Sequence, residues 1–179
     1  MSQGGAGMTS PVRLRLWGPV SGIGVVAVLL AFAADQAHKY WMLNIYRIGE
    51  RAGPDNRVEI TSYFDLVMAW NKGVSYGLFT QHGLTGRLIL IAVSLAAIAG
   101  LLIWLANSLT RLAGLSLGLI VGGALGNLTD RIVHGAVADF FHFHYAEWSW
   151  YIFNVADMAI VAGVIGLMLD WMRQDRQDH

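Results

Sequence analysis

The chain alternates between long apolar segments and shorter polar stretches. Four segments, 16–34, 88–106, 112–128 and 153–169, are almost entirely apolar, and Asp157 is the only charged residue inside them. A helix that crosses a bilayer needs about 20 mostly apolar residues, and these segments reach or approach that length. The pattern therefore predicts an all-α integral membrane protein with four transmembrane helices.

The first apolar segment also has features of a cleaved signal peptide. Arg13 and Arg15 precede it, and the Ala-Phe-Ala sequence at 31–33 imitates a cleavage site. An uncleaved span is favoured, because three further spans follow and the apolar run is longer than a typical signal core. The expected parts of the chain are a disordered tail at 1–15, one membrane domain at 16–172 and a C-terminal tail at 173–179.

Residues 40–86 form the one sizeable part of the chain outside the spans. A Gly-Pro-Asp-Asn sequence at 53–56 indicates a turn. Residues 58–67 are rich in β-branched and aromatic side chains, which favours short strands. We therefore predict a small extracytoplasmic β-sheet on the outer membrane face. Residues 81–87 are either a mobile lid or a simple connector.

Glycine recurs at every fourth position of the third segment, at 114, 118, 122 and 126. Residues four apart share one helix face, so these glycines leave a smooth ridge against which another helix can pack closely. Tight helix packing accounts for most of them. Gly126 lies next to polar residues and is also a candidate for opening space for a substrate.

Composition narrows the possible function classes. Of the 179 residues, 55% are hydrophobic and only 13% are charged, against about 25% charged in soluble domains. Twelve Lys and Arg balance twelve Asp and Glu, so no net field attracts nucleic acid. The absence of cysteine excludes disulfides, thiolate metal sites and a cysteine nucleophile.

Polar and ionisable side chains gather at one end of three of the four spans. Within each group they lie three or four positions apart, on one helix face. The groups are Asp35 and Lys39 after the first span, Asn127, Asp130 and Arg131 at the end of the third, and Asn154 and Asp157 at the start of the fourth. Because successive spans run in opposite directions, these three ends share a leaflet. Ionisable groups there are costly and usually functional, so we predict one site.

Two acids in apolar surroundings are the candidates for catalysis. Asp157 lies inside the fourth span, and Asp139 lies between apolar neighbours just after the third. Two adjacent carboxylates cannot both ionise cheaply, so they share a proton; one can activate a water while the other polarises a carbonyl. The alternative is structural, with Asp139 capping a helix and Asp157 pairing with Arg131. Spacing alone leaves both interpretations open.

Five short blocks of the sequence contain most of these polar residues. They are 35–39 (DQAHK), 71–77 (NKGVSYG), 122–131 (GGALGNLTDR), 137–140 (VADF) and 153–157 (FNVAD). Together the blocks resemble the lipoprotein signal peptidases, also called type II signal peptidases. They occur in the family's order and extend from the first span into the fourth, and the long Gly-to-Arg block and the Asn-Val-Ala-Asp block are the most specific.

The resemblance implies an aspartic endopeptidase with Asp139 and Asp157 as its catalytic residues. Its substrate would be a prolipoprotein with a diacylglyceryl-modified cysteine, cut just before that cysteine at the outer face of the bacterial cytoplasmic membrane. We expect a monomer that contacts this substrate and membrane lipids, with no nucleic acid, cofactor or metal. The residues expected to line the substrate site are Asn71, Gly73, Asn127, Arg131 and Asn154. The residues expected to support the helices and the acids are Asp35, Lys39 and Asp130.

Four spans place both termini on the same side of the membrane. That side carries Arg13, Arg15, Arg111, Arg173 and Arg176, close to the ends of the spans. Lys and Arg near the membrane favour the cytoplasmic side, so we expect both termini to be cytoplasmic. The acids then lie towards the outer face, in agreement with the resemblance.

A metal hydrolase is one alternative to the aspartic enzyme. His134, His142 and His144, with Asp139, could ligate zinc. His142 and His144 alternate with aromatic residues, however, so they equally fit the polar face of a strand-like segment beside the headgroups. No helical His-x-x-x-His pair is present.

Two further alternatives use other groups. In a serine/lysine peptidase, Ser75 would be the nucleophile, with Lys39 or Lys72 as its base. In a small transporter, the buried acids would relay protons or bind ions. Transporters commonly contain internal repeats, and no repeat is visible in this sequence.

Overall fold

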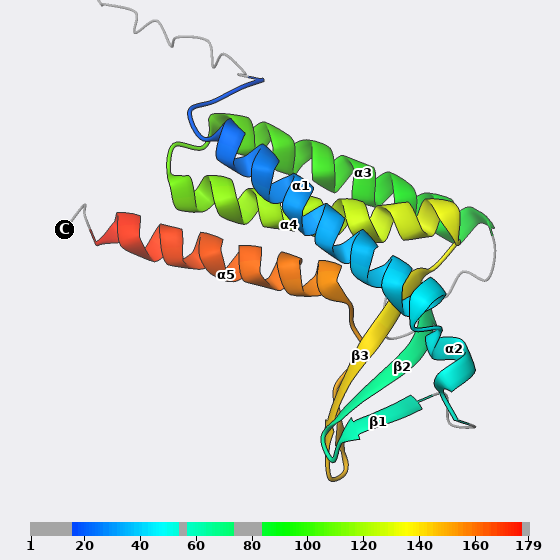
Figure 1. Ribbon diagram of the computed structural model, residues 1–179. Helices are drawn as coiled ribbons and strands as arrows, with labels where there is room; N and C mark the ends of the chain where they lie inside the picture. The colour runs from blue at the N-terminus through cyan, green and yellow to red at the C-terminus, as the bar shows by residue number, and fades with distance from the viewer. Residues whose placement is uncertain (1–15, 54–56, 74–83, 177–179) are drawn as a thin grey trace, which may run out of the picture.

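The computed structural model of the protein describes residues 16–53, 57–73 and 84–176. The predicted tail at 1–15, the alternative nucleophile Ser75 and part of the predicted lid or connector lie outside the described residues. The described chain forms a bundle of long helices from which a small sheet projects at one end (Figure 1).

Four helices in the described part are long and apolar enough to cross a membrane, as the hydrophobic pattern predicts. They are α1 (Ser21–Tyr40, continued by a π-helical turn at Trp41–Ile45), α3 (Leu84–Asn107), α4 (Arg111–Val133) and α5 (Val155–Asp175). The central helix is α4, which packs against the other three. Of the residues in its most apolar 18-residue stretch, 56% are buried inside the protein. In the corresponding stretch of α3, only 11% of the residues are buried by the rest of the protein. Most of the surface of α3 would therefore face lipid, which is consistent with apolar residues on all sides of this helix.

The first helix extends further than the predicted segment 16–34. It begins at Ser21, whose hydroxyl accepts a hydrogen bond from the backbone N–H of Gly18. It continues through Asp35 and Lys39, which are only 0% and 4% exposed. The sequence analysis predicted that the span would end before Asp35, the first charged residue after the apolar segment. The helix continues because both charges are paired inside the bundle.

The sheet has four antiparallel strands in the order β1-β2-β3-β4. They are β1 (Arg57–Thr61), β2 (Phe64–Asn71), β3 (Val137–Tyr145) and β4 (Trp148–Ser149). The predicted strands in residues 40–86 are thus β1 and β2. The other half of the sheet comes from the connection between α4 and α5, where the alternation of histidine with aromatic residues was the one sign of a strand.

A small apolar core fixes the sheet to the end of α1. Met42, Ile48, Ala138 and Phe140 are almost completely buried together, with Ile48 supplied by the short helix α2 (Ile48–Arg51). Because side chains alternate along a strand, burial of Ala138 and Phe140 turns Asp139 to the opposite face of β3. The core therefore sets the direction of one of the two candidate acids.

The glycine ridge of α4 packs against α1, as predicted. A Cβ on Gly118 would meet the backbone oxygen of Gly24, and one on Gly122 would lie 2.6 Å from the oxygen of Val28. At Gly126 the free space is filled by the Asp35 carboxylate. The prediction that Gly126 opens space for a substrate is therefore wrong, because it makes room for a buried acid.

Replacing Gly122 by alanine should destabilise the protein by about 1–3 kcal/mol, because the added carbon must displace the α1 backbone. The matched control is Gly100→Ala in α3, where the added carbon has no neighbour within 4 Å among the described residues other than nearby backbone of its own helix. Both changes gain the same helix propensity, so the difference in thermal unfolding in detergent isolates the packing cost. Equal melting temperatures for the two variants would contradict the close packing.

Candidate active site

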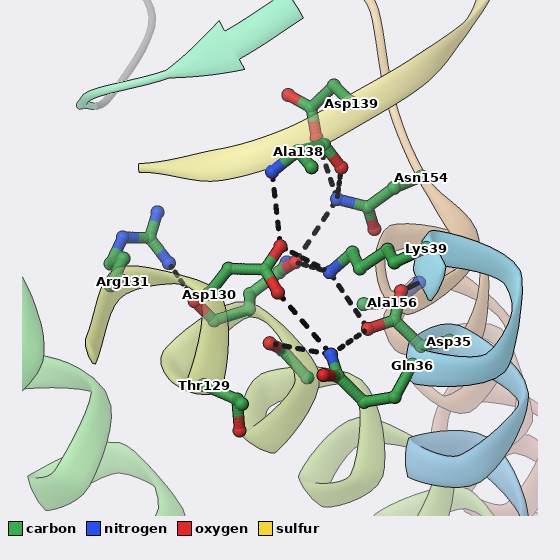
Figure 2. A network of polar contacts seen from close by, with 12 residues as sticks. Asp35, Gln36, Lys39, Thr129, Asp130, Arg131, Ala138, Asp139, Asn154 and Ala156 are labelled. Carbon is green, nitrogen blue, oxygen red and sulfur yellow. Dashed lines mark hydrogen bonds and ion pairs between the residues drawn. The ribbon is translucent and has the colours of Figure 1, made fainter. Parts of the chain in front are cut away.

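A buried ion cluster, formed by Asp35, Lys39 and Asp130, joins α1 to α4. The Lys39 Nζ lies 2.8 Å from Asp35 Oδ2 and 2.8 Å from Asp130 Oδ2. Figure 2 shows the ammonium between the two carboxylates, and each side chain is at most 5% exposed. Charges buried this deeply are tolerated only when they are paired, so the three groups depend on one another.

The ion cluster also holds backbone from two later elements. Asp130 Oδ2 accepts a hydrogen bond of 3.1 Å from the N–H of Ala138, and Asp35 Oδ1 accepts one of 2.9 Å from the N–H of Ala156 (Figure 2). Ala138 in β3 and Ala156 in α5 each come directly before one of the two candidate acids. The supporting residues therefore place the backbone on which both acids stand.

Asn154 connects the two acids through a single side chain. It is the N-cap of α5, where its Oδ1 accepts from the backbone N–H of Asp157 while Asp157 Oδ2 accepts from the backbone N–H of Asn154. This reciprocal capping box fixes Asp157 in the first helical turn. The Asn154 amide nitrogen donates to Asp139 Oδ1 at 2.6 Å. The helix cap is thus Asn154, and Asp139 lies in β3 and caps no helix.

Amide groups supply the remaining hydrogen bonds to the acids. Asn71, at the end of β2, donates to Asp139 Oδ2 at 3.2 Å and accepts from the backbone N–H of Gly73. Asn127 in α4 donates to Asp157 Oδ1 at 2.9 Å. Within the described ranges, no Lys or Arg forms an ion pair with either acid. Both acids are therefore held by neutral donors.

Burial raises the pKa of Asp139 to about 6, and the negative charge of Asp157 adds to the rise. Hydrogen bonds from Asn154 and Asn71 and the charge of Lys39 favour the ionised form and oppose the shift. Burial dominates because Asp139 is only 3% exposed. Up to about pH 6 the pair of acids can therefore hold one proton, so that one member donates and the other accepts.

An apolar groove of about 370 Å³ runs along α5 from Asp157. Its walls are aromatic near the acid and aliphatic further along the helix. The other lining residues are Trp150, Tyr151, Phe153, Met158, Val161, Ala162 and Ile165. A carboxylate at the end of an apolar groove in a membrane helix suits a ligand with a polar reacting group and a lipid-like extension.

Comparison with known proteins identifies the family. Residues 27–173 match the sequence profile described as signal peptidase (SPase) II. The chain belongs to the signal peptidase II family. It is 51% identical to a lipoprotein signal peptidase of Methylorubrum extorquens, over 84% of this chain and 85% of that protein. It is 50% identical to one of Nitrobacter hamburgensis, over 82% of this chain and 90% of that protein. The family predicted from the five blocks is confirmed, and the chain is a peptidase.

Two solved structures, both described as bacterial membrane enzymes determined by the in meso method, share the fold. Their TM-scores are 0.72 and 0.69, and the matches cover 93% and 89% of this chain and 96% and 97% of theirs. Their sequences are only 19% and 20% identical to this one. The likeness therefore establishes the membrane fold alone.

Arg131 lies beside the acids without pairing to them. Its Nη1 donates to the backbone oxygen of Asn127 at 3.3 Å, and its Nε is buried with no hydrogen-bond partner among the described residues. The structural alternative in which Asp157 pairs with Arg131 is therefore not observed.

The histidines proposed as zinc ligands do not meet at the acids. His142 Nδ1 and His144 Nε2 lie 3.7 and 3.0 Å from Oδ2 of the buried Asp65. Asp139, in contrast, is bonded to amides. Across the described residues, no three His, Asp or Glu side chains are arranged to hold a metal. The zinc ligand set suggested by His134, His142, His144 and Asp139 is therefore not assembled there.

Gln36 belongs to the support of the site, although the sequence did not single it out. Its Nε2 lies 3.1 Å from Asp35 Oδ2, 3.4 Å from Asp130 Oδ1 and 3.4 Å from the backbone oxygen of Gly126 (Figure 2). It therefore bridges both acids of the ion cluster on the side away from Lys39. The available signal was its place inside the Asp-Gln-x-x-Lys block.

Replacing Lys39 by methionine should destabilise the protein by about 3–5 kcal/mol, because it leaves two buried carboxylates without a cation. Arg47→Met is the control, since it removes a cation from the Arg47–Glu50 pair, whose side chains are 63% and 72% exposed. That change should cost less than about 1 kcal/mol. Similar losses in denaturant unfolding would show that the ion cluster contributes no more than a surface pair.

Proposed function

We propose that this chain is a lipoprotein signal peptidase that acts as an aspartic endopeptidase. It removes signal peptides from diacylglyceryl-modified prolipoproteins by cutting just before the lipidated cysteine. The observation that carries the proposal is the connection of Asp139 to Asp157 through Asn154, at the end of a membrane helix bundle. The family membership and the names of the curated relatives support the class of substrate.

In the proposed reaction, Asp157 takes a proton from a water molecule, and the water oxygen attacks the scissile carbonyl carbon. Asp139, whose pKa is raised, keeps its proton and donates a hydrogen bond to the carbonyl oxygen as negative charge develops there. When the C–N bond breaks, the proton on Asp157 passes to the cysteine amine. The two acids return to their singly protonated state without a metal or a covalent intermediate.

The surrounding amides and cation divide into two roles. Asn154 is completely buried, with 0% of its surface exposed. Its side chain is hydrogen-bonded to Asp139, Asn127 and the α5 backbone. We therefore assign Asn154 and Asn127 to positioning the acids. Arg131, which is half-buried and forms no ion pair with either acid in the described chain, and the residue Gly73 are assigned to substrate contact.

The groove along α5 supports a lipid-modified substrate. It begins at Asp157 and continues past Met158, Val161 and Ile165, which lie on one face of a membrane helix. An acyl chain placed there remains in the apolar layer while the cysteine to which it is attached stays near the acids. Burial of the chain against apolar walls contributes about 25 cal/mol per Å².

The proposed orientation places the sheet and both acids towards the outer face of the bacterial cytoplasmic membrane. The opposite end of the bundle carries Arg111 at the start of α4 and Arg173 in the last turn of α5. Short cytoplasmic loops and tails are enriched in such cations, which supports cytoplasmic termini.

Asp139→Asn and Asp157→Asn should each abolish cleavage of a lipid-modified precursor by the purified protein, measured both with and without a chelator. Each change removes either the proton donor or the base, which should lower turnover by at least about 10³-fold. Asp175→Asn, at an exposed acid at the end of α5, is the matched control and should retain full activity. Far-UV circular dichroism checks that the inactive variants are folded.

Other outcomes would favour the alternatives. Near-normal cleavage by either dyad variant would refute the assignment of the acids. Activity lost only to chelator would return attention to the histidines. Loss of activity in Ser75→Ala, at a position outside the described residues, would favour a serine nucleophile. Ion or substrate flux in liposomes without cleavage would support a transporter.

The value of kcat/KM should fall as the pH rises through about 6, because the free enzyme then loses the proton held by Asp139. The same shift affects folding, because the folded pKa lies above the ordinary 3.8. The folded protein binds the extra proton between about pH 4 and 6, so its stability falls by up to about 3 kcal/mol as the pH rises through that window. Asp139→Asn should remove this slope from unfolding curves. A rising kcat/KM between pH 6 and 8 would contradict the assigned proton.

A further inference from the structure

A second cavity lies at the opposite end of the bundle from the two acids. Its volume is about 510 Å³, and its lining residues come from the end of α3, the start of α4 and the end of α5. These three helix ends lie at the same end of the bundle in Figure 1. None of its lining residues belongs to the candidate active site. They are Trp104, Asn107, Ser108, Leu109, Thr110, Ala113, Leu167, Asp170, Trp171 and Gln174.

Asp170 is the group in this cavity that requires an explanation. It belongs to α5, is only 8% exposed, and accepts one hydrogen bond, of 2.6 Å, from the neutral amide of Gln174. In the part of the chain that the structure describes, no Lys, Arg or His pairs with it. An acid in a membrane helix is costly unless it is paired, so its position predicts a cation supplied from outside the described chain.

The other walls of the cavity suit an organic cation held at the membrane surface. Trp104 and Trp171 line it from α3 and α5, and the faces of indole rings attract ammonium groups. Tryptophan is also enriched at the level of lipid headgroups. Leu109 and Leu167 add apolar surface, while Thr110 adds a polar edge. The cavity therefore combines an acid, two aromatic rings and apolar walls at one end of the spans.

We propose that this cavity binds the headgroup of a phospholipid that carries a primary ammonium group, with the ammonium donating hydrogen bonds to Asp170. A lipid is favoured over a soluble amine because the cavity lies at the ends of three membrane helices and has apolar walls. The exposed Arg111 and Arg173 are at the same end and complement the lipid phosphate. The bound lipid fixes the end of α5 that lies opposite Asp157.

The test measures lipid binding to the delipidated, purified full chain in detergent by native mass spectrometry. Short-chain phosphatidylethanolamine is titrated against phosphatidylglycerol with the same acyl chains, which lacks the ammonium. The wild type should bind the ethanolamine lipid at least ten-fold more tightly. Asp170→Asn should remove this preference, and Asp175→Asn, at an exposed acid near the end of the same helix, should preserve it.

Three results would overturn the proposal. One is equal preference for the ethanolamine lipid in the wild type and in Asp170→Asn, once unfolding curves show that both are folded. Another is equal binding of the two lipids by the wild type. The third is competition by free ethanolamine as strong as competition by the lipid, which would indicate a soluble amine. Because the readout is binding, these results do not depend on whether the acids Asp139 and Asp157 are catalytic.

Discussion

The pairing of Lys39 with Asp35 and Asp130 is the interaction on which the rest of the site depends. It allows α1 to remain helical through two charges that would otherwise end the span. The same two carboxylates bind the backbone of β3 and of α5, one residue before each candidate catalytic acid. Since the groups are nearly inaccessible to solvent, none can exchange its partner for water without a large free-energy cost.

The two acids themselves are held by neutral amides, and this difference has a chemical consequence. A cation in direct contact with Asp139 would stabilise its ionised form and lower its pKa. Amide donors hold the carboxylate in place but do not overcome burial, which raises the pKa of Asp139 to about 6. The chain thus keeps its ion pairs one residue along the backbone from the two acids proposed to react. The two acids are thus held in fixed positions, while the pKa of Asp139 stays raised.

The two ends of α5 present different chemistry along one helix. At its start, Asn154 fixes Asp157 in a capping box beside an apolar groove. Towards its end, Asp170 lines a cavity with a single amide partner in the described chain. The middle of the helix packs tightly on α4 through Gly163, where an added Cβ would meet the Ser116 backbone. This rigid central contact separates the site assigned to cleavage from the site assigned to lipid binding.

The hydrophobic pattern by itself determined the four spans and the glycine ridge, because lipid imposes length and apolarity on every crossing helix. The sequence motifs determined the family. Only the tertiary structure decided where α1 ends, because Asp35 and Lys39 are tolerated inside the bundle through distant partners. Lys39 also pairs with Asp130 of α4, and Asp35 accepts a hydrogen bond from the backbone N–H of Ala156, 121 residues away in the chain. Likewise, β3 forms by pairing with β2, and Asn71 reaches Asp139 across 68 residues. Such contacts arise from packing and not from local periodicity, so spacing could not choose between Arg131 and Asn154 as the partner of the acids.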